Sequence, residues 1–93
     1  MCIRDSCCTT PARLFGFAHK GQLLPGYDAD VVLFDPAREF TISSDSLHET
    51  AGWTPYDGLA LRGWPTTTIS RGEVIVADGC WLGAAGRGRF LLR

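Results

Sequence analysis

The chain has 93 residues, 45% of them hydrophobic and 20% charged, and a formal net charge of -1. This near-neutral balance excludes the strong single-sign field that attracts nucleic acid or an anionic membrane, and no apolar run approaches the ~20 residues of a membrane-spanning helix. A chain of this length is one small domain or a part of a larger one.

Three of the four cysteines lie within the first eight residues, and Cys7 and Cys8 are adjacent, a spacing that suits no ordinary disulfide framework. The chain has no Cys-x-x-Cys pair of the kind that holds structural zinc. Reduced thiols are therefore expected, as in a cytoplasmic protein. Residues 1–8 show no hydrophobic periodicity, and we expect them to be a non-native or disordered leader.

The first predicted helix covers Thr10–Gly16. Thr10 is a suitable N-cap residue, Pro11 stands at the first helical position, and Gly16 can adopt the left-handed conformation that ends a helix. So short a helix has too little apolar surface to be stable alone. Pro25-Gly26 then suits the two central positions of a type II turn.

Short β-rich runs follow this turn. Val31–Phe34 is apolar without alternation, which predicts a strand covered on both faces, and Pro36 is expected to end it. Phe40–Ser43 alternates between apolar and polar residues and predicts a half-exposed strand. Ser46–Glu49 has the spacing of a capping box and predicts one helical turn.

The second half of the chain predicts hairpins. A break is expected at Gly63–Pro65, followed by strands over Thr66–Arg71 and Glu73–Ala77. Asp78-Gly79 is a strong hairpin signal and joins the second of these strands to Cys80–Leu82. The prediction is a mainly β fold of about five antiparallel strands after one short helix. Because that helix cannot cover a sheet, a further layer is expected to cover the apolar face.

The candidates for metal binding or acid–base chemistry are the histidines and a set of carboxylates. His19 and His48 lie far apart on predicted loops, without the close ligand spacing that forms a metal site, so no metal ligand is predicted. The carboxylates are Asp28, Asp30, Asp35, Glu49 and Asp57. Their positions beside turns favour hydrogen bonds to local backbone N–H groups. No catalytic residue is therefore predicted.

Two other patterns could indicate ligand binding. Gly83–Arg89 is glycine-rich like a phosphate-binding loop, but it lacks the Lys-Ser/Thr ending and the following helix, so a flexible tail is expected. Trp53, Trp64 and Trp81 could stack on bases or sugars. The near-neutral charge favours packing in a core or an interface for these tryptophans.

A set of short motifs follows a fixed order along the chain. The motifs are Thr10–Gly16, Lys20-Gly21, Pro25–Val32, Leu47-His48, Thr54–Gly58, Gly63–Pro65, Ser70–Val74 and Gly86–Leu91. In this order, the set resembles the C-terminal end of the cyclic amidohydrolases, closest to dihydropyrimidinase and D-hydantoinase, with allantoinase and dihydroorotase as relatives. The resemblance covers residues 9–93. Each motif alone is weakly specific, and the order and spacing carry the assignment.

The resemblance implies that the mainly β fold is the C-terminal share of a small amidohydrolase β-sandwich. One short helix would precede it and would end a (β/α)8 barrel that is missing from this chain. On this interpretation, residues 9–22 are the last helix of the barrel and its connection, and residues 23–93 are the sandwich part with its tail. Other parts of the polypeptide would cover the apolar sheet.

The resemblance also implies hydrolysis of a C–N bond in a cyclic amide at a binuclear metal centre, usually zinc, held by residues of the barrel. His19, His48 and Lys20 fall outside those ligand motifs, so the isolated chain is predicted to be inactive and to bind no metal. The parent protein is expected to be a homo-oligomer acting on a small cyclic amide, with no nucleic-acid or membrane partner. The tail, Gly83–Arg93, is a candidate for the subunit contact.

Thr10 is the one candidate substrate-binding residue. Hydantoinase-like enzymes usually have Asn before the Pro-Ala of this helix, where it helps to contact the substrate ring. Threonine keeps a hydroxyl but has no amide to donate and accept together, which leaves the identity of the cyclic amide open. Two alternatives also stay open: a non-catalytic, dihydropyrimidinase-related structural protein, and a self-standing β interaction module.

Overall fold

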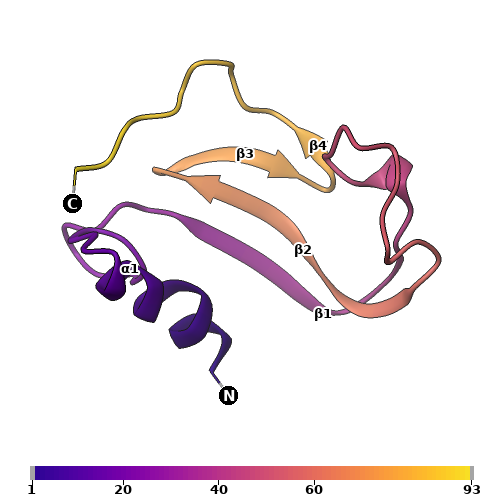
Figure 1. Ribbon diagram of the computed structural model, residues 1–93, viewed down its shortest axis with the longest axis horizontal. Coiled ribbons are helices and arrows are strands. Elements are labelled where there is room, and N and C mark those ends of the chain that lie inside the picture. Colours follow the sequence, from indigo (N-terminus) through magenta and orange to yellow (C-terminus); the bar gives the residue numbers. More distant parts are fainter. Residues whose placement is uncertain (1, 93) are drawn as a thin grey trace.

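A curved four-stranded antiparallel sheet is the largest element of the computed structural model, which describes residues 2–92 (Figure 1). The strands are β1 (Val31–Thr41), β2 (Ala60–Ser70), β3 (Glu73–Ala77) and β4 (Cys80–Trp81). Each strand pairs with its neighbour in sequence, in the spatial order β1-β2-β3-β4. The predicted mainly β fold is confirmed, with four strands in the described part instead of about five.

A helical segment precedes the sheet. A π-helical turn over Asp5–Thr9 runs directly into α1 (Thr10–Leu14), and the left-handed Gly16, with φ of 75°, follows. The prediction of Thr10 as N-cap is wrong, because the preceding residues continue the helix and the Thr10 N–H donates to the Asp5 carbonyl. Helical backbone also occupies most of the predicted leader, whose non-native origin stays a prediction. Met1, and Arg93 of the predicted tail, lie outside the described residues.

Strand β1 continues through Pro36 and does not end there. Asp35 and Glu39, four residues apart, pair with Trp64 and Arg62, which are only two residues apart. The extra residues of β1 form a bulge, where proline needs no N–H for the ladder. The two strands predicted on either side of Pro36 are therefore one bulged strand.

Gly63 lies opposite this bulge, buried and at a φ of 101°. A Cβ built there would lie 2.6 Å from Cζ of Phe34, so the ring occupies the space that a side chain would need. The predicted break at Gly63–Pro65 is wrong, since these residues lie inside β2. The close approach of backbone and ring explains the glycine without a break in the strand.

The predicted hairpin turn at Asp78-Gly79 is confirmed, and Arg71, which was predicted to end a strand, forms a second turn with Gly72. Arg71-Gly72 joins β2 to β3 with φ of 50° and 79°, and Asp78-Gly79 joins β3 to β4 with φ of 47° and 79°. Positive φ at both central residues is typical of the type I′ turn, whose twist matches that of the strands. The predicted helical turn at Ser46–Glu49 is displaced: a 3₁₀ helix covers Ser44–Ser46, with the capping box between Ser43 and Ser46.

The apolar side chains of the sheet are largely exposed to solvent. Among the described residues, Ala12 and Ile42 are the buried hydrophobic side chains, while Val32, Leu33 and Phe34 are 57%, 50% and 59% exposed. The strand predicted to be covered on both faces is thus about half exposed, because residues 2–92 supply no second layer that covers it. Its accessible surface is 7308 Å², whereas about 5,300 Å² is expected for a folded monomer of 10.1 kDa. The radius of gyration, 15.1 Å, likewise exceeds the roughly 12 Å of a compact domain of this length.

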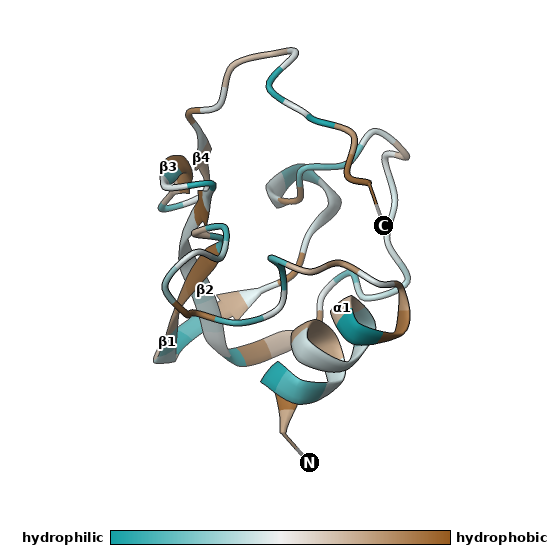
Figure 2. Cartoon of the chain, turned by 90° about the vertical axis from the view of Figure 1, so that its left-hand side faces the viewer, coloured by the Kyte–Doolittle hydropathy of each residue, from teal (hydrophilic) through white to brown (hydrophobic). Residues whose placement is uncertain are grey.

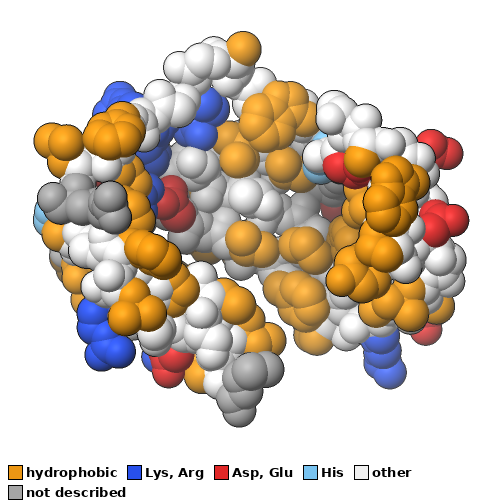
Figure 3. Space-filling view, in the orientation of Figure 1, with side chains coloured by type: hydrophobic (Ala, Val, Ile, Leu, Met, Phe, Trp, Pro, Cys, Tyr) orange, Lys and Arg blue, Asp and Glu red, His pale blue; other side chains and the backbone are white. Residues whose placement is uncertain are grey.

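The remaining segments project to one side of the sheet. Figure 2 shows α1, the loop between β1 and β2 and the C-terminal segment on that side. The space-filling view shows hydrophobic side chains on both sides of the hollow between them (Figure 3). No helix within residues 2–92 has the length and apolar character needed to cross a membrane.

Candidate functional site

The residues predicted from the sequence as site candidates do not converge. Thr10 is half-buried on the first turn of α1. His19 is exposed and meets the Tyr27 ring edge to face, with centroids 6.0 Å apart, and His48 is exposed on the loop between β1 and β2. Across the described part of the chain, no three His, Cys, Asp or Glu side chains are grouped to hold a metal ion.

Two of the carboxylates satisfy local turns as predicted. Asp35 Oδ1 accepts the N–H of Ala37 at 2.9 Å, and Glu49 Oε2 accepts the N–H of Ala51 at 2.9 Å. At the turn that contains Asp57, the side-chain acceptor is instead Thr54 Oγ1, which accepts the N–H of the residue two positions later at 3.3 Å. These contacts leave no acid–base pair among the three carboxylates.

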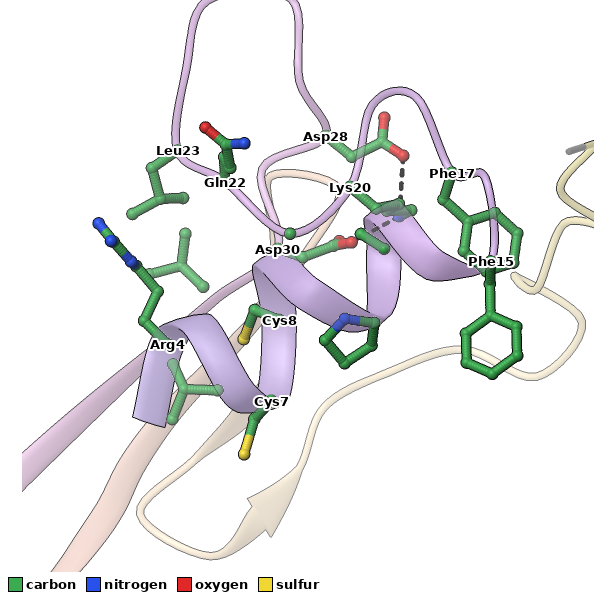
Figure 4. A pocket seen from close by; sticks show the side chains of 15 residues that line it. Arg4, Cys7, Cys8, Phe15, Phe17, Lys20, Gln22, Leu23, Asp28 and Asp30 are labelled. Carbon is green, nitrogen blue, oxygen red and sulfur yellow. Dashed lines mark hydrogen bonds and ion pairs between the residues drawn. The ribbon is translucent and has the colours of Figure 1, made fainter. Parts of the chain in front are cut away.

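Asp28 and Asp30 bind groups that are distant in the sequence. The prediction that they accept hydrogen bonds from neighbouring backbone N–H groups is therefore wrong. The ammonium of Lys20 lies 2.8 Å from Oδ2 of Asp28 and 2.5 Å from Oδ2 of Asp30. Asp30 Oδ1 also accepts the backbone N–H of Arg71, 41 residues along the chain, at 2.9 Å. We refer to Lys20, Asp28, Asp30 and Arg71 as the Lys20 junction. Figure 4 shows the lysine between the two carboxylates, beside the helical segment.

The opposite charges of the Lys20 junction favour the protonated form of Lys20 and the ionised form of Asp30. Partial burial acts to lower the pKa of Lys20, but the hydrogen bonds and charges of Asp28 and Asp30 outweigh it and raise this pKa above its ordinary 10.5. Partial burial acts to raise the pKa of Asp30, but Lys20 and the N–H of Arg71 hold it below its ordinary 3.8. At neutral pH Lys20 therefore keeps its proton, so it serves as a fixed cation and not as a base or nucleophile.

A cavity of about 440 Å³ opens between the helical segment, its connection and β1. Cys7, Cys8 and Phe15 line it on the helical side, and Lys20 and Asp30 line it from the connection that leads to β1 (Figure 4). Thr10 is not among its lining residues. With an apolar wall and a neutralised ion cluster, this cavity has the chemistry of a packing surface, and the free thiols of Cys7 and Cys8 are the nucleophilic groups in its lining.

Arg87 anchors the C-terminal segment, which was predicted to be a flexible tail. Its guanidinium donates to the Ser70 carbonyl at 2.8 Å, to Ser70 Oγ at 2.9 Å and to Glu73 Oε2 at 2.9 Å. The Arg71 guanidinium donates in turn to the Arg87 carbonyl. After Trp81 the described segment has no helix or strand, but it is tied to the β2–β3 hairpin by side chains.

Sequence reasoning missed the structural roles of Lys20, Arg71 and Arg87. Each of these cations lies in one of the ordered motifs, and that order was the available signal. Of the tryptophans, Trp64 packs as predicted, stacked on Phe40 with ring centroids 3.8 Å apart.

Comparisons with known proteins agree with this fold. A family model described as "Amidohydrolase family" matches residues 3–75. The chain is 49% identical over 84 residues to a D-phenylhydantoinase of Escherichia coli O127:H6, an alignment that covers 89% of this chain and 18% of the relative.

Solved structures give the same assignment. A D-hydantoinase matches with a TM-score of 0.84 and 39% identity over 90% of this chain and 19% of its own. The L-hydantoinase (dihydropyrimidinase) of Arthrobacter aurescens matches with a TM-score of 0.87 and 33% identity, over 92% of this chain and 19% of its own. This chain thus spans about a fifth of the length of these relatives. On the family match and the shared fold, the chain belongs to the amidohydrolase family.

Proposed function

We propose that this chain is the C-terminal part of a metal-dependent cyclic amidohydrolase, which hydrolyses a C–N bond of a cyclic amide as hydantoinases and dihydropyrimidinases do. One observation carries the proposal: the chain matches these enzymes over about nine-tenths of its own length but only a fifth of theirs. A binuclear zinc centre, a cytoplasmic location and a homo-oligomeric parent belong to the same proposal.

The open sheet supports this assignment. The chain exposes about 2,000 Å² more surface than a folded monomer of its mass, and both faces of β1 carry half-exposed apolar side chains. Such a surface is expected for a segment that packs against the remainder of a longer protein. A self-standing interaction module would need a core of its own.

The metal centre is assigned to the rest of the parent protein. Within residues 2–92 the side chains offer no suitable set of ligands, and Lys20, one of the cations that line the cavity, is neutralised by two carboxylates. This chain contributes architecture: it fixes α1 beside the sheet and gives Thr10 its position on the helix. The contact between Thr10 and the substrate ring is part of the proposal.

A chimeric enzyme tests the proposal. Residues 9–93 replace the matching segment of the Escherichia coli D-phenylhydantoinase, and hydrolysis of hydantoin, phenylhydantoin and dihydrouracil is measured together with metal content. The chimera is expected to bind metal and to hydrolyse at least one of these cyclic amides. The bacterial enzyme without the segment, and the 93-residue chain alone, are the controls and are expected to be inactive.

Two results would contradict the proposal. The first is a folded, metal-loaded chimera without hydrolysis, which would show that this segment cannot take the place of its counterpart in a hydantoinase. The second is stoichiometric zinc and turnover in the 93-residue chain alone, which would place the active centre in this segment.

A further inference from the structure

The helical segment is fixed to the connection that follows it through Gly21. The Thr9 hydroxyl donates to the Gly21 carbonyl at 2.9 Å. A Cβ built on Gly21 would lie 2.6 Å from the Cys8 carbonyl oxygen and 2.8 Å from Cβ of Ala12, one of the buried hydrophobic residues. The backbone at Gly21 is thus in direct contact with the helix, which also fixes the neighbouring Lys20.

The same connection is closed by a backbone hydrogen bond of its own and is fixed to the sheet by a backbone bond and by the carboxylate of Asp30. The Asp28 N–H donates to the His19 carbonyl at 3.0 Å, and the Gly72 N–H donates to the Ala29 carbonyl at 2.9 Å. Asp30 adds its bond to the N–H of Arg71. The turn between β2 and β3 therefore binds residues 29 and 30 through two successive N–H groups.

We infer that Lys20 is a positioning residue, and that the Lys20 junction holds α1, and with it Thr10, in one place relative to the sheet. Its ammonium is the side-chain link between the part of the chain in contact with the helix and the part bound to the β2–β3 turn, beside the backbone bond from the Asp28 N–H to the His19 carbonyl. The side chain is 23% exposed, so water screens this link less than it screens an open surface pair.

Removal of the lysine charge should do more than delete two ion pairs. Asp28 and Asp30 would then face each other without a cation between them, and like charges at this separation repel. The carboxylates would separate or bind solvent, and Asp30 would no longer be aimed at the Arg71 N–H. Loss of order is therefore expected at the helix and at the hairpin turn together, although α1 and Arg71 lie about sixty residues apart in sequence.

Hydrogen exchange on the full 93-residue chain tests this coupling. Lys20→Met keeps the aliphatic stem and removes the charge, and Lys20→Arg restores a cation. Arg38→Met is the matched control, because Arg38 pairs with Asp78 at 3.0 Å on the same sheet, with 37% and 79% exposure. In Lys20→Met, peptides covering residues 8–22 and 69–73 are expected to exchange about tenfold faster, a loss equivalent to one broken junction bond.

The control variant Arg38→Met and the rescue variant Lys20→Arg show whether the effect is specific to the charge of Lys20. Arg38→Met is expected to leave both peptides unchanged, and Lys20→Arg to restore most of their protection. Unchanged exchange in Lys20→Met would overturn the inference. So would faster exchange spread equally over β3 and β4, because that pattern reports general destabilisation and not a link between two places.

The effect on Thr10 rests on the proposed function and is measured in the chimeric enzyme. Lys20→Met is expected to raise KM for the cyclic amide about tenfold, with metal content unchanged and kcat little affected, because a misplaced contact weakens substrate binding. Lys20→Arg should recover the lower KM. A lower melting temperature with an unchanged KM would limit Lys20 to a stabilising role. If the parent chimera is itself inactive, the proposed function fails, while the exchange result still decides the junction.

Discussion

Asp30 combines two roles on one carboxylate, and they respond differently to substitution. Oδ2 neutralises Lys20, whereas Oδ1 accepts the backbone N–H of Arg71. Asparagine can keep the second bond but not the charge, and alanine removes both. The side chain is 41% exposed, so screening by solvent limits the electrostatic part.

The first prediction separates these roles by pH. At pH 7, Asp30→Asn is expected to lower the free energy of unfolding of the chain by about 0.5 kcal/mol and Asp30→Ala by about 1.5 kcal/mol. The pKa of Asp30 in the folded state lies below its ordinary 3.8. Its charge therefore stabilises the fold above about pH 3.8, and this contribution is lost as pH falls through the folded-state pKa.

Denaturant titrations of the three chains at several pH values check this prediction. The difference between the wild type and Asp30→Asn should shrink toward zero in acid. The pKa of Lys20 is raised above 10.5, so its own contribution is present below that pH and is lost only as pH rises through the folded-state value. A difference that stays constant down to pH 2 would show that charge at Asp30 has no role.

In the proposed function, Thr10 helps to contact the substrate ring. Thr10→Val has nearly the same shape and removes only the hydroxyl, so kcat/KM of the chimeric enzyme for hydantoin is expected to fall about tenfold, the value of one hydrogen bond. Thr10→Asn, which supplies an amide, should restore or exceed the original value. Full activity in Thr10→Val, at unchanged metal content, would remove Thr10 from the substrate site.

Among the structural elements, those determined by neighbouring residues could be predicted, and those determined by residues far apart in the sequence could not. The turn Asp78-Gly79 could be predicted because two adjacent residues determine a type I′ hairpin, whereas Arg71 of the turn Arg71-Gly72 was predicted to lie in a strand. The bulge at Pro36 was not, because it depends on the register with Gly63 on another strand. The bond from Asp30 to Arg71 spans 41 residues and has no local pattern, so a local cap was predicted in its place.

The third prediction concerns the glycine opposite the bulge. Gly63 has both a positive φ and a neighbouring ring at 2.6 Å from a built Cβ, whereas Gly72 has a positive φ and open space. Gly63→Ala is expected to destabilise the chain by about 3 kcal/mol, from backbone strain and overpacking together. Gly72→Ala carries the strain alone and should cost about 1 kcal/mol. Equal losses in urea unfolding would show that the Phe34 ring yields freely.

For the whole molecule, the excess of exposed surface is the dominant physical fact. Burial of apolar surface is the main driving force of folding, and this chain buries few of its large apolar side chains. The sequence already indicated the deficit, since one short helix could not cover the predicted sheet. The sequence could not indicate what covers each face of the strand in the proposed parent, because an apolar run such as Val31–Phe34 has the same pattern in any fully buried strand.

The last prediction tests both faces of β1 separately. Val32 and Leu33 are adjacent, so their side chains point to opposite faces of the strand, and they are 57% and 50% exposed. In the 93-residue chain, a hydrophobic dye should bind and the chain should self-associate, and Val32→Lys or Leu33→Lys should reduce both effects. In the chimeric enzyme, each lysine should instead reduce thermal stability and the yield of folded protein, since burial of an unpaired charge costs several kcal/mol.

Val74 on β3 is also exposed in this chain, and Val74→Lys is the matched control in a strand other than β1. If only one of the two β1 variants harms the chimera, β1 is covered on one face in the parent, and the prediction of a strand buried on both faces is wrong.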